Sequence, residues 1–356
     1  MHTVEAVPRR RDVRRLPVTL VLLVLALAVA VTAVLSIGFG AEPLPASVVV
    51  DVLRHRVGGS GTTDSAYDAI VWQIRLPRTI LGLVVGAGLA IAGAGIQTLV
   101  RNPLADPYLL GVSSGASVGA TAVITFGVLS GLGLWSLSVG ALFGALLAAV
   151  LVFGVAMLQG GLTPLRLVLT GTVLSSAFSS IASFMVFRSA EPQAAQTVLF
   201  WLLGSLSGAT WEQLWLPCVA VVAAFGVLMS GSGWLDALAV GADTAAALGI
   251  PVRALRIALF VLLAVLVGIL VAVAGGIGFV GLVLPHIARL LVGPRHRVSL
   301  PVVALAGALF LVWVDIAARV MVRPTEIPLS VVTGLIGAPV FLVLLGRRSY
   351  RFGGDR

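Results

Sequence analysis

Charged residues are scarce in this sequence, and one basic residue type is missing. Only 10% of the 356 residues are charged and 59% are apolar, whereas soluble domains carry about 25% charged residues. This composition excludes a soluble globular enzyme, a disordered chain and a collagen-like chain. No lysine occurs, so all 23 basic residues are arginine. The sequence therefore has no Walker A loop and no Schiff-base lysine, and any ATP that its work requires must bind to another chain.

Cysteine and clustered catalytic groups are equally scarce. Cys218 is the single cysteine, so neither an internal disulfide nor a CxxC metal site can form. The sequence shows no paired catalytic carboxylates, no Ser/His/Asp set and no metal-ligand cluster, so we expect neither an enzyme nor a cofactor in this chain. No basic stretch is interleaved with aromatic residues, so the net charge of +9 does not indicate a nucleic-acid partner.

Long apolar runs are abundant. A helix crosses a bilayer with about 20 mostly apolar residues, and these runs lack the alternation of β-barrel strands. We predict an all-α polytopic membrane protein with about ten transmembrane helices. The first run is too long for the apolar core of a signal peptide, which has about 7–15 residues, so we expect it to remain as a helix. The predicted spans are Leu16–Ile37, Ile80–Leu99, Leu109–Val128, Leu134–Met157, Leu167–Phe187, Leu214–Met229, Leu255–Val273, Ile277–Leu291, Leu300–Val322 and Leu329–Leu345.

The arginines predict the orientation. Ten spans place both termini on one side of the membrane, and most of the arginines fall on that side. Because cytoplasmic loops carry the excess of basic residues, both termini are predicted to be cytoplasmic. The chain then divides into a basic N-terminal segment at residues 1–15, a ten-helix transmembrane domain at residues 16–346 and a cytoplasmic tail at residues 347–356. Membrane lipid is its expected surrounding.

Small residues recur at helical spacing within the spans. Gly115 and Gly119 lie four apart in the third span, and Gly140 and Gly144 do the same in the fourth. Small residues let helix backbones approach closely in lipid, so we predict tight packing; a path for a bulky solute is the alternative. The glycine-rich stretch at residues 275–281 permits irregular backbone, which membranes tolerate only where protein or a cavity covers it. The hydroxyls that could line a path are Ser113, Ser114, Ser117, Ser175, Ser176 and Ser179.

Two groups of charged residues lie at span ends. Asp315 and Arg319 are four apart on one helical face and predict a local ion pair. Arg75 and Arg78 are three apart just before a span, so they should point outward together. Interfacial snorkelling and a basic rim for the carboxylates of a partner both explain them. The preceding residues, 38–75, are predicted to form the longest outer connection, with a flexible glycine-rich tip at residues 58–61.

The inner loop at residues 231–254 contains signals for a short helix. Asp243 or the threonine after it can cap the helix, residues 245–248 propagate it, and Gly249 with Pro251 ends it. A short helix across the cytoplasmic face suits a groove on another protein. A plain connector is the alternative.

Several blocks of residues carry a family resemblance. They are Leu76-Pro77-Arg78 through Gly93, Asn102–Pro107, Leu110-Gly111 with Ser113–Gly115, Gly275–Gly281 with Leu284-Pro285-His286, Asp315 with Arg319, Glu326-Ile327-Pro328, and Gly334–Pro339. Together, in consistent order over residues 16–346, they resemble the permease subunits of ABC importers for iron chelates, haem and cobalamin.

The resemblance implies a ten-span permease of the bacterial cytoplasmic membrane. It would pair with a second copy or a close paralogue around a central path. Two ATPase subunits, which hold ATP and Mg²⁺, would bind beneath, and one extracytoplasmic substrate-binding protein would dock above. The expected function is import of an iron siderophore by alternating access. Haem or cobalamin import is the alternative within the family, and an ion-coupled secondary transporter is the alternative of another class.

The resemblance also assigns roles to residues. Arg75, Arg78 and Arg319 match family positions that meet glutamates on the binding protein. Thr163, Pro164 and Leu165 match the region of the cytoplasmic gate, where Pro164 and Leu165 replace the small hydroxyl residues expected in the cobalamin branch. That difference weighs against a cobalamin substrate. The segment that matches the ATPase-coupling loop contains Gly241, Asp243, Ala245, Ala246, Leu248, Gly249 and Pro251.

Overall fold

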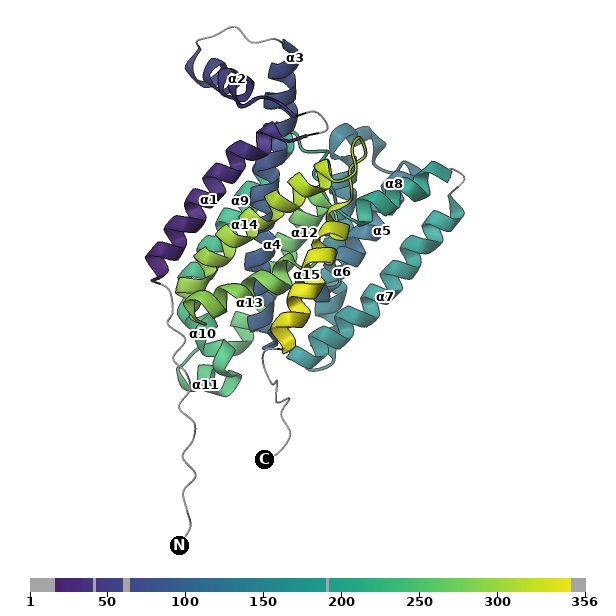
Figure 1. Cartoon of the computed structure of the whole chain (residues 1–356). Coiled ribbons are helices and arrows are strands. Elements are labelled where there is room, and N and C mark those ends of the chain that lie inside the picture. The colour runs from purple at the N-terminus through teal and green to yellow at the C-terminus, as the bar shows by residue number, and fades with distance from the viewer. Residues whose placement is uncertain (1–16, 41–42, 60–64, 190–191, 347–356) are drawn as a thin grey trace.

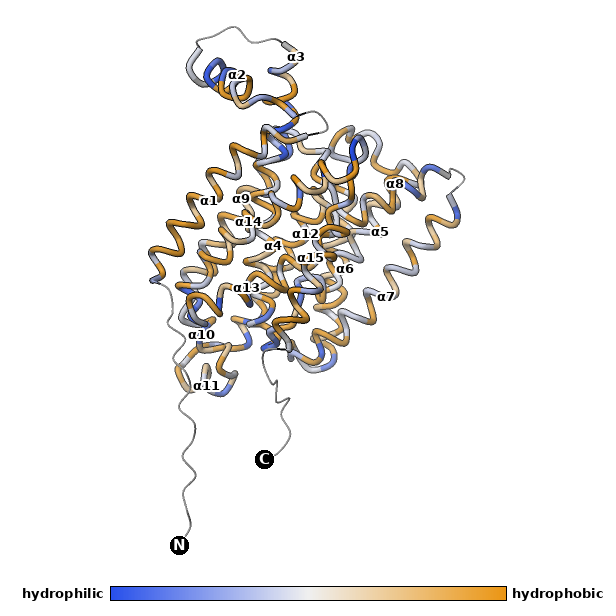
Figure 2. Tube along the Cα trace, in the orientation of Figure 1, coloured by the Kyte–Doolittle hydropathy of each residue, from blue (hydrophilic) through white to orange (hydrophobic). Residues whose placement is uncertain are grey.

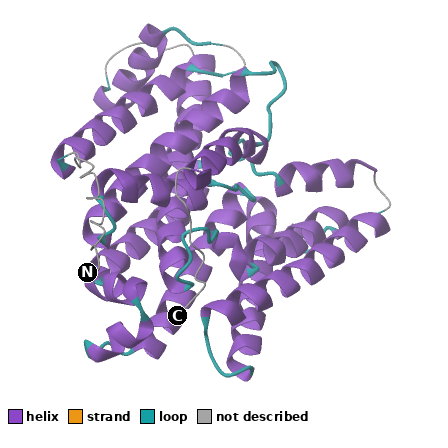
Figure 3. Ribbon diagram, turned by 60° about the horizontal axis from the view of Figure 1, so that its bottom comes forward, coloured by secondary structure: helices purple, strands orange, loops and turns teal. Residues whose placement is uncertain are grey.

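The described part of the chain is built from helices and the loops that join them. The computed structural model describes residues 17–40, 43–59, 65–189 and 192–346, and none of these residues lies in a strand (Figure 3). The predicted all-α class is confirmed. The segments at residues 1–15 and 347–356 lie outside the described residues, so the cytoplasmic placement of the termini stays a prediction.

The transmembrane helices follow the predicted order. Among the described residues, seven helical segments are long and apolar enough to cross a membrane and three apolar helices are shorter. Each of the ten predicted spans coincides with one of them. The long helices are α1 (Val18–Gly38), α4 (Leu76–Leu99), α6 (Ser136–Leu158), α7 (Pro164–Arg188), α9 (Trp211–Ser230), α12 (Val252–Ala274) and α14 (His296–Val320), and the shorter ones are α5 (Val112–Phe126), α13 (Val280–Val292) and α15 (Leu329–Gly346).

Helix α4 runs through the middle of the bundle, whereas α1 and α7 lie at its edges (Figure 1). The most apolar stretch of α4 is 78% buried, against 22% for α1 and 28% for α7. Helix α1 is apolar along its whole length (Figure 2), and Leu23 and Leu27 on it are exposed. An exposed apolar surface that covers a whole helix marks a contact with a membrane or with another protein. The outer helices therefore face lipid or another chain.

The connection between α1 and α4 is largely helical, and residues 60–61 of its predicted flexible tip lie outside the described residues. Val49 and Val52, one turn apart on α2, pack against Ile37 and Val71 in a small second core. This core folds the segment onto the end of α1 (Figure 1). Its helices are α2 (Ala46–Gly58), α3 (Ser65–Asp68) and the π-helix η1 (Ala69–Arg75); the other short helices of the chain are η2 (Pro107–Leu110), η3 (Ser130–Trp135), α8 (Pro192–Leu202), α10 (Ser232–Val240) and α11 (Ala242–Ala247).

The chain leaves the helical conformation between α12 and α13, as the glycine-rich stretch indicates. Side chains from two other segments bind the freed backbone groups. The Tyr108 hydroxyl accepts a bond from the Ile277 N–H at 2.7 Å and donates to the Ile277 carbonyl at 3.0 Å. The Ser330 hydroxyl donates to the Gly276 carbonyl at 2.6 Å. Because protein groups replace water here, the irregular backbone is stable inside the bundle.

Glycines bring helices α5 and α6 into backbone contact. A Cβ atom on Gly119 would lie 1.9 Å from the carbonyl oxygen of Gly140, and one on Gly115 would lie 2.3 Å from that of Gly144. Any side chain at these positions would force the two helices apart. The predicted packing role of these glycines is therefore confirmed, and this face does not line an open path.

We expect Gly119→Ala to destabilise the protein by about 1–3 kcal/mol, the usual cost of overpacking a tight contact. The matched control is Gly154→Ala on α6, where a Cβ atom would meet no atom within 4 Å. Thermal unfolding of both variants in the same detergent measures the difference. Equal melting temperatures would contradict the packing role of Gly119.

Candidate functional site

A buried ion network lies at the end of the bundle where α1 ends and α4 begins. One oxygen of Asp315 on α14 accepts a bond from Arg78 Nε at 3.0 Å, and the other lies 2.9 Å from Arg319 Nη2. Arg78 also donates to both oxygens of Glu326, at 2.7 and 2.9 Å. The predicted pair of Asp315 with Arg319 is confirmed. The sequence analysis missed that Arg78 and Glu326 complete it.

The same arginines hold the end of α1. The last carbonyls of a helix have no partner within the helix, and here guanidinium groups bind them. Arg319 Nη1 donates to the Phe39 carbonyl at 2.7 Å, and its Nη2 donates to the Ser36 hydroxyl at 2.9 Å. Arg75 Nη1 donates to the Ile37 carbonyl at 2.8 Å. Three helices are therefore joined at this end by arginine side chains.

Arg75, Arg78 and Arg319 do not form an exposed basic rim. They are 7%, 6% and 4% exposed. The prediction that Arg75 and Arg78 point outward is wrong, because buried carboxylates and carbonyls bind their guanidinium groups. Pulling an arginine out to meet a partner would leave a buried group unpaired, which is costly. The exposed arginines at this end include Arg54 and Arg56 on α2, Arg188 at the end of α7 and Arg323 after α14.

Helices α10 and α11 lie at the opposite end of the bundle, below the long helices in Figure 1. The predicted short helix is confirmed as α11, which ends before Gly249, a residue with a φ of +78°. Its predicted cap is wrong. Gly241 occupies the N-cap position and no side chain caps the helix, while Asp243 lies one position further inside. Gly241 makes the turn between α10 and α11.

The residues assigned to ATPase coupling fall into two groups. Gly241 and Ala245 are buried against the bundle, and their assignment to ATPase coupling stays a prediction. Val240 and Leu248 are exposed apolar residues at the two ends of α11, with 69% and 68% of their surface free. The exposed members of the predicted set are Asp243, Ala246, Leu248, Gly249 and Pro251.

Three polar side chains attach α10 to the core helices. Asp236 on α10 lies 2.6 Å from His296 Nδ1 and accepts a bond from the His296 N–H at 2.8 Å. The other ring nitrogen, Nε2, lies 2.8 Å from the Thr98 hydroxyl on α4. The sequence analysis missed this Asp236–His296–Thr98 link, because its members are far apart along the chain and no short motif contains them.

The predicted path serines do not form one cluster. Ser117 on α5 and Ser179 on α7 border the same cavity of about 310 Å³, which α8 closes on a third side. The hydroxyls of α7 mostly bond to their own helix; Ser176, for example, donates to the Thr172 carbonyl at 3.2 Å. Of the remaining predicted serines, Ser113, Ser114 and Ser175 are half-buried and Ser176 is exposed.

The residues assigned to the gate form the start of α7. The Thr163 hydroxyl accepts the Arg166 N–H at 3.5 Å as the N-cap, and Pro164 is the first helical residue. Leu165 is 68% exposed. This segment borders a second cavity that it shares with the start of α12.

The turn between α4 and α5 holds an acidic group with a shifted pKa. The Asp106 carboxylate caps η2 by accepting the Tyr108 N–H at 2.9 Å. Burial raises the pKa of Asp106 to about 6, because one backbone hydrogen bond only partly offsets the loss of water. Asp106 thereby positions Tyr108, whose hydroxyl binds the break after α12.

We expect Asp315→Asn to destabilise the protein strongly, by about 3–5 kcal/mol, because it leaves two buried arginines without their shared charge. Asp68→Asn is the control, since it removes the acidic partner of Arg56 in an exposed ion pair and should change little. Thermal unfolding in detergent reports both. A small, equal shift in the two variants would show that the Asp315 network does not hold this end together.

Comparison with known proteins places these features in a family. Residues 22–347 match the FecCD transport family. The ABC transporter permease YvrB of Bacillus subtilis is 40% identical over 321 residues, covering 88% of this chain and 90% of that protein. The vitamin B12 import permease BtuC of Klebsiella pneumoniae is 43% identical over 279 residues, covering 78% of this chain and 82% of that protein. The molybdate import permease MolB of Haemophilus influenzae is 38% identical over 314 residues, covering 88% of this chain and 91% of that protein.

A solved structure agrees with the sequence relatives. It is described as an inward-facing conformation of a metal-chelate type ABC transporter, and it is 34% identical with a TM-score of 0.81, covering 93% of this chain and 100% of its own. These matches argue against the ion-coupled secondary transporter. The chain belongs to the FecCD transport family and is an integral cytoplasmic-membrane permease of an ABC importer.

Proposed function

We propose that this permease pairs with a second copy of itself and imports an iron chelate that an extracytoplasmic binding protein delivers. Two ATPase subunits would hold ATP and Mg²⁺ and drive alternating access. The observation that carries this proposal is the family match over residues 22–347. The lysine-free sequence supports it, because this chain has no Walker A lysine of its own.

The exposed face of α7 is the proposed lining of the path. Ser176, Ser179 and Ser183 are exposed there, and Ser183 donates to the Ser179 carbonyl at 2.8 Å. A hydroxyl that bonds to its own helix can face lipid without cost, yet it still offers an acceptor to a polar solute. A second copy against this face would turn the serine row inward. The gate would then lie at the start of α7, at Thr163, Pro164 and Leu165.

Helix α11 is the proposed contact with the ATPase. Leu248 and Ala246 present small and apolar surface at the end of the bundle, which suits insertion into a groove on a partner. The Asp236–His296–Thr98 link then carries the movement of α10 and α11 to α14 and α4. A ligand shifts the balance between two conformations only if it binds one of them more tightly. ATP binds to the ATPase, so it can shift the permease only if α11 and the helices linked to it change position together with the ATPase.

The binding protein is proposed to dock at the opposite end, near Arg54 and Arg323. Both arginines are exposed, so they can steer an acidic partner and set its register. The buried trio of Arg75, Arg78 and Arg319 would support this surface from beneath. Exposed ion pairs add only about 0.2–1 kcal/mol each, so the arginines should affect the association rate more than the final affinity.

An iron chelate is the proposed solute, and cobalamin is the second candidate. The similar solved structure is described as metal-chelate type, whereas BtuC is named for vitamin B12. Both solutes hold their metal inside an organic ligand. Accordingly, the described residues contain no group of three or more His, Cys, Asp or Glu side chains placed to hold a metal, and the chelate would pass intact. Pro164 and Leu165 at the gate favour the iron chelate over cobalamin.

We expect Asp236→Ala to uncouple ATP hydrolysis from transport. Hydrolysis by the reconstituted importer should stay within about twofold of wild type, while solute uptake per ATP falls roughly tenfold, or ~1.4 kcal/mol of coupling. The control is Asp51→Ala, an exposed carboxylate on α2 at the far end. If the three side chains of the link act as one unit, the double variant Asp236→Ala with His296→Ala loses no more uptake per ATP than either single variant does. Unchanged uptake per ATP in Asp236→Ala would contradict the proposed link.

We expect the binding protein that co-purifies with this permease to bind a ferric siderophore about 100-fold more tightly than cobalamin, haem or molybdate, which corresponds to ~2.7 kcal/mol. Calorimetric titration of that protein with the four ligands gives the order. Tightest binding of cobalamin would favour the second candidate. Uptake by the permease alone, without an ATPase, would contradict the whole proposal.

A further inference from the structure

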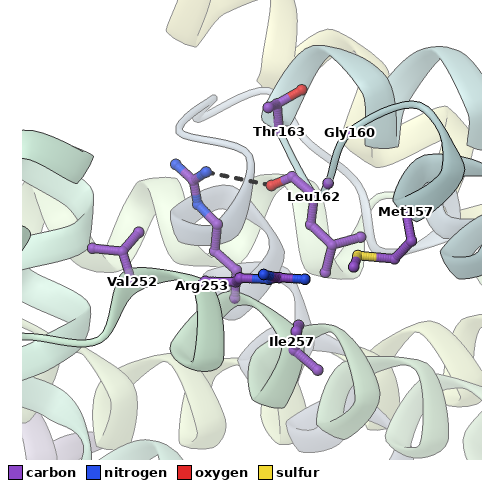
Figure 4. A pocket seen from close by; sticks show the side chains of 9 residues that line it. Met157, Gly160, Leu162, Thr163, Val252, Arg253 and Ile257 are labelled. Carbon is purple, nitrogen blue, oxygen red and sulfur yellow. Dashed lines mark hydrogen bonds between the residues drawn. The ribbon is translucent and has the colours of Figure 1, made fainter.

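A basic cavity of about 530 Å³ opens where the α6–α7 loop meets the start of α12. Figure 4 shows it from close by, with Met157, Leu162 and Thr163 from the loop side and Arg253 and Ile257 from α12. The helices α7 and α12 both begin at its edge, with no acidic residue in their first turns. Helix N-termini carry partial positive charge, so they add to the charge of the arginines.

The arginines of this cavity have no acidic partner among the described ion pairs. Arg256 donates to the Leu162 carbonyl at 3.4 Å, the dashed line in Figure 4. Its Nε is buried and makes no hydrogen bond within the described residues. Arg253 is exposed, and the Arg166 guanidinium lies beside Gly160, where a Cβ atom would be 3.0 Å from it. A cluster of cations that the protein leaves uncompensated favours a bound anion.

An apolar groove lies on the same two helices. It is a cavity of about 300 Å³ between α6 and α12, and all of its lining residues are apolar, among them Val150, Phe153, Phe260 and Val261. The rings of Phe153 and Phe260 lie 5.7 Å apart across it. Met157 of the basic cavity follows Phe153 by four residues, and Ile257 precedes Phe260 by three. Because these spacings keep residues on one helical face, the groove continues toward the basic cavity.

The length of α6 that the two cavities span matches the thickness of one bilayer leaflet. From Leu146 at the far end of the groove to Met157, α6 rises about 17 Å at 1.5 Å per residue. Half of the ~30 Å hydrocarbon core of a bilayer is about the same length. The basic cavity therefore lies at headgroup depth when the groove lies at acyl-chain depth.

We propose that this surface binds one anionic phospholipid, with its phosphate at Arg253 and Arg256 and an acyl chain in the α6–α12 groove. A free phosphate would leave the groove empty, and a soluble partner would not reach it inside the membrane. Basic pockets between transmembrane helices bind anionic headgroups in this manner. The lipid joins the loop before α7 to the helix that follows α11, so it links the proposed gate to the proposed coupling helix. The binding itself does not rest on the proposed function.

Native mass spectrometry of the full-length chain with phosphatidylglycerol and phosphatidylcholine of matched chains tests the proposal. Wild type should retain one phosphatidylglycerol per chain in preference to phosphatidylcholine. Arg253→Gln with Arg256→Gln should reduce that retention at least tenfold, and the corresponding double Lys variant should keep most of it. Arg188→Gln with Arg323→Gln is the control, because it removes the same charge at the other end of the bundle. Comparable melting temperatures confirm that the variants are folded.

A variant of the groove separates the lipid from other anions. Val150→Trp fills the groove without touching the arginines and should also lower phosphatidylglycerol retention, roughly threefold or more. Equal retention of the two lipids, or equal loss in the control variant, would overturn the proposal. Displacement by inorganic phosphate with no effect of Val150→Trp would indicate a free-anion site instead. Retention only when an ATPase subunit is bound would assign the arginines to that partner.

Discussion

One buried carboxylate, Asp315, determines how an end of this bundle is built. It lies between Arg78 and Arg319, each of which binds a further segment: Glu326 after α14 in one case and the last turn of α1 in the other. Unpaired charges are costly inside a bilayer because no water solvates them there. Each charged side chain of the Asp315 network therefore needs a partner within the protein. In this structure the arginines are therefore bound to carboxylates and backbone groups of their own chain.

Helices α4 and α14 both carry members of the Asp315 network and of the Asp236–His296–Thr98 link. Helix α4 begins beside Arg78 and ends beside Thr98, while α14 begins at His296 and ends beside Asp315. Between the two networks the helices pack backbone to backbone, where a Cβ atom on Gly86 would lie 2.3 Å from the Gly307 carbonyl oxygen. Two helices tied at both ends and tightly packed between them behave as one rigid body. In the proposed importer, this body connects the docking end to the coupling end.

The sequence predicted those features that depend on neighbours along the chain. Hydropathy placed ten spans, a four-residue spacing paired Asp315 with Arg319, and an alanine run located α11. Contacts between distant residues were out of reach: Arg78 meets Asp315 across 237 residues. That is why its burial was missed and why an outward direction was assigned to it. Helix α2 was missed because only two of its residues, Val49 and Val52, are buried, and its other apolar residues follow no clear helical pattern.

The exclusive use of arginine suits both kinds of site. Arg78 binds two carboxylates at once because a planar guanidinium presents five N–H groups in a fixed fork. A lysine offers its three donors from one point and cannot reproduce the two-pronged contact of Arg78 with Glu326 together with its bond to Asp315. An ammonium group also loses its proton more readily when it is buried, whereas a guanidinium stays charged. Arg256 can therefore remain charged and only partly paired at the membrane boundary, and this makes the basic cavity between the α6–α7 loop and the start of α12 attractive to a phosphate.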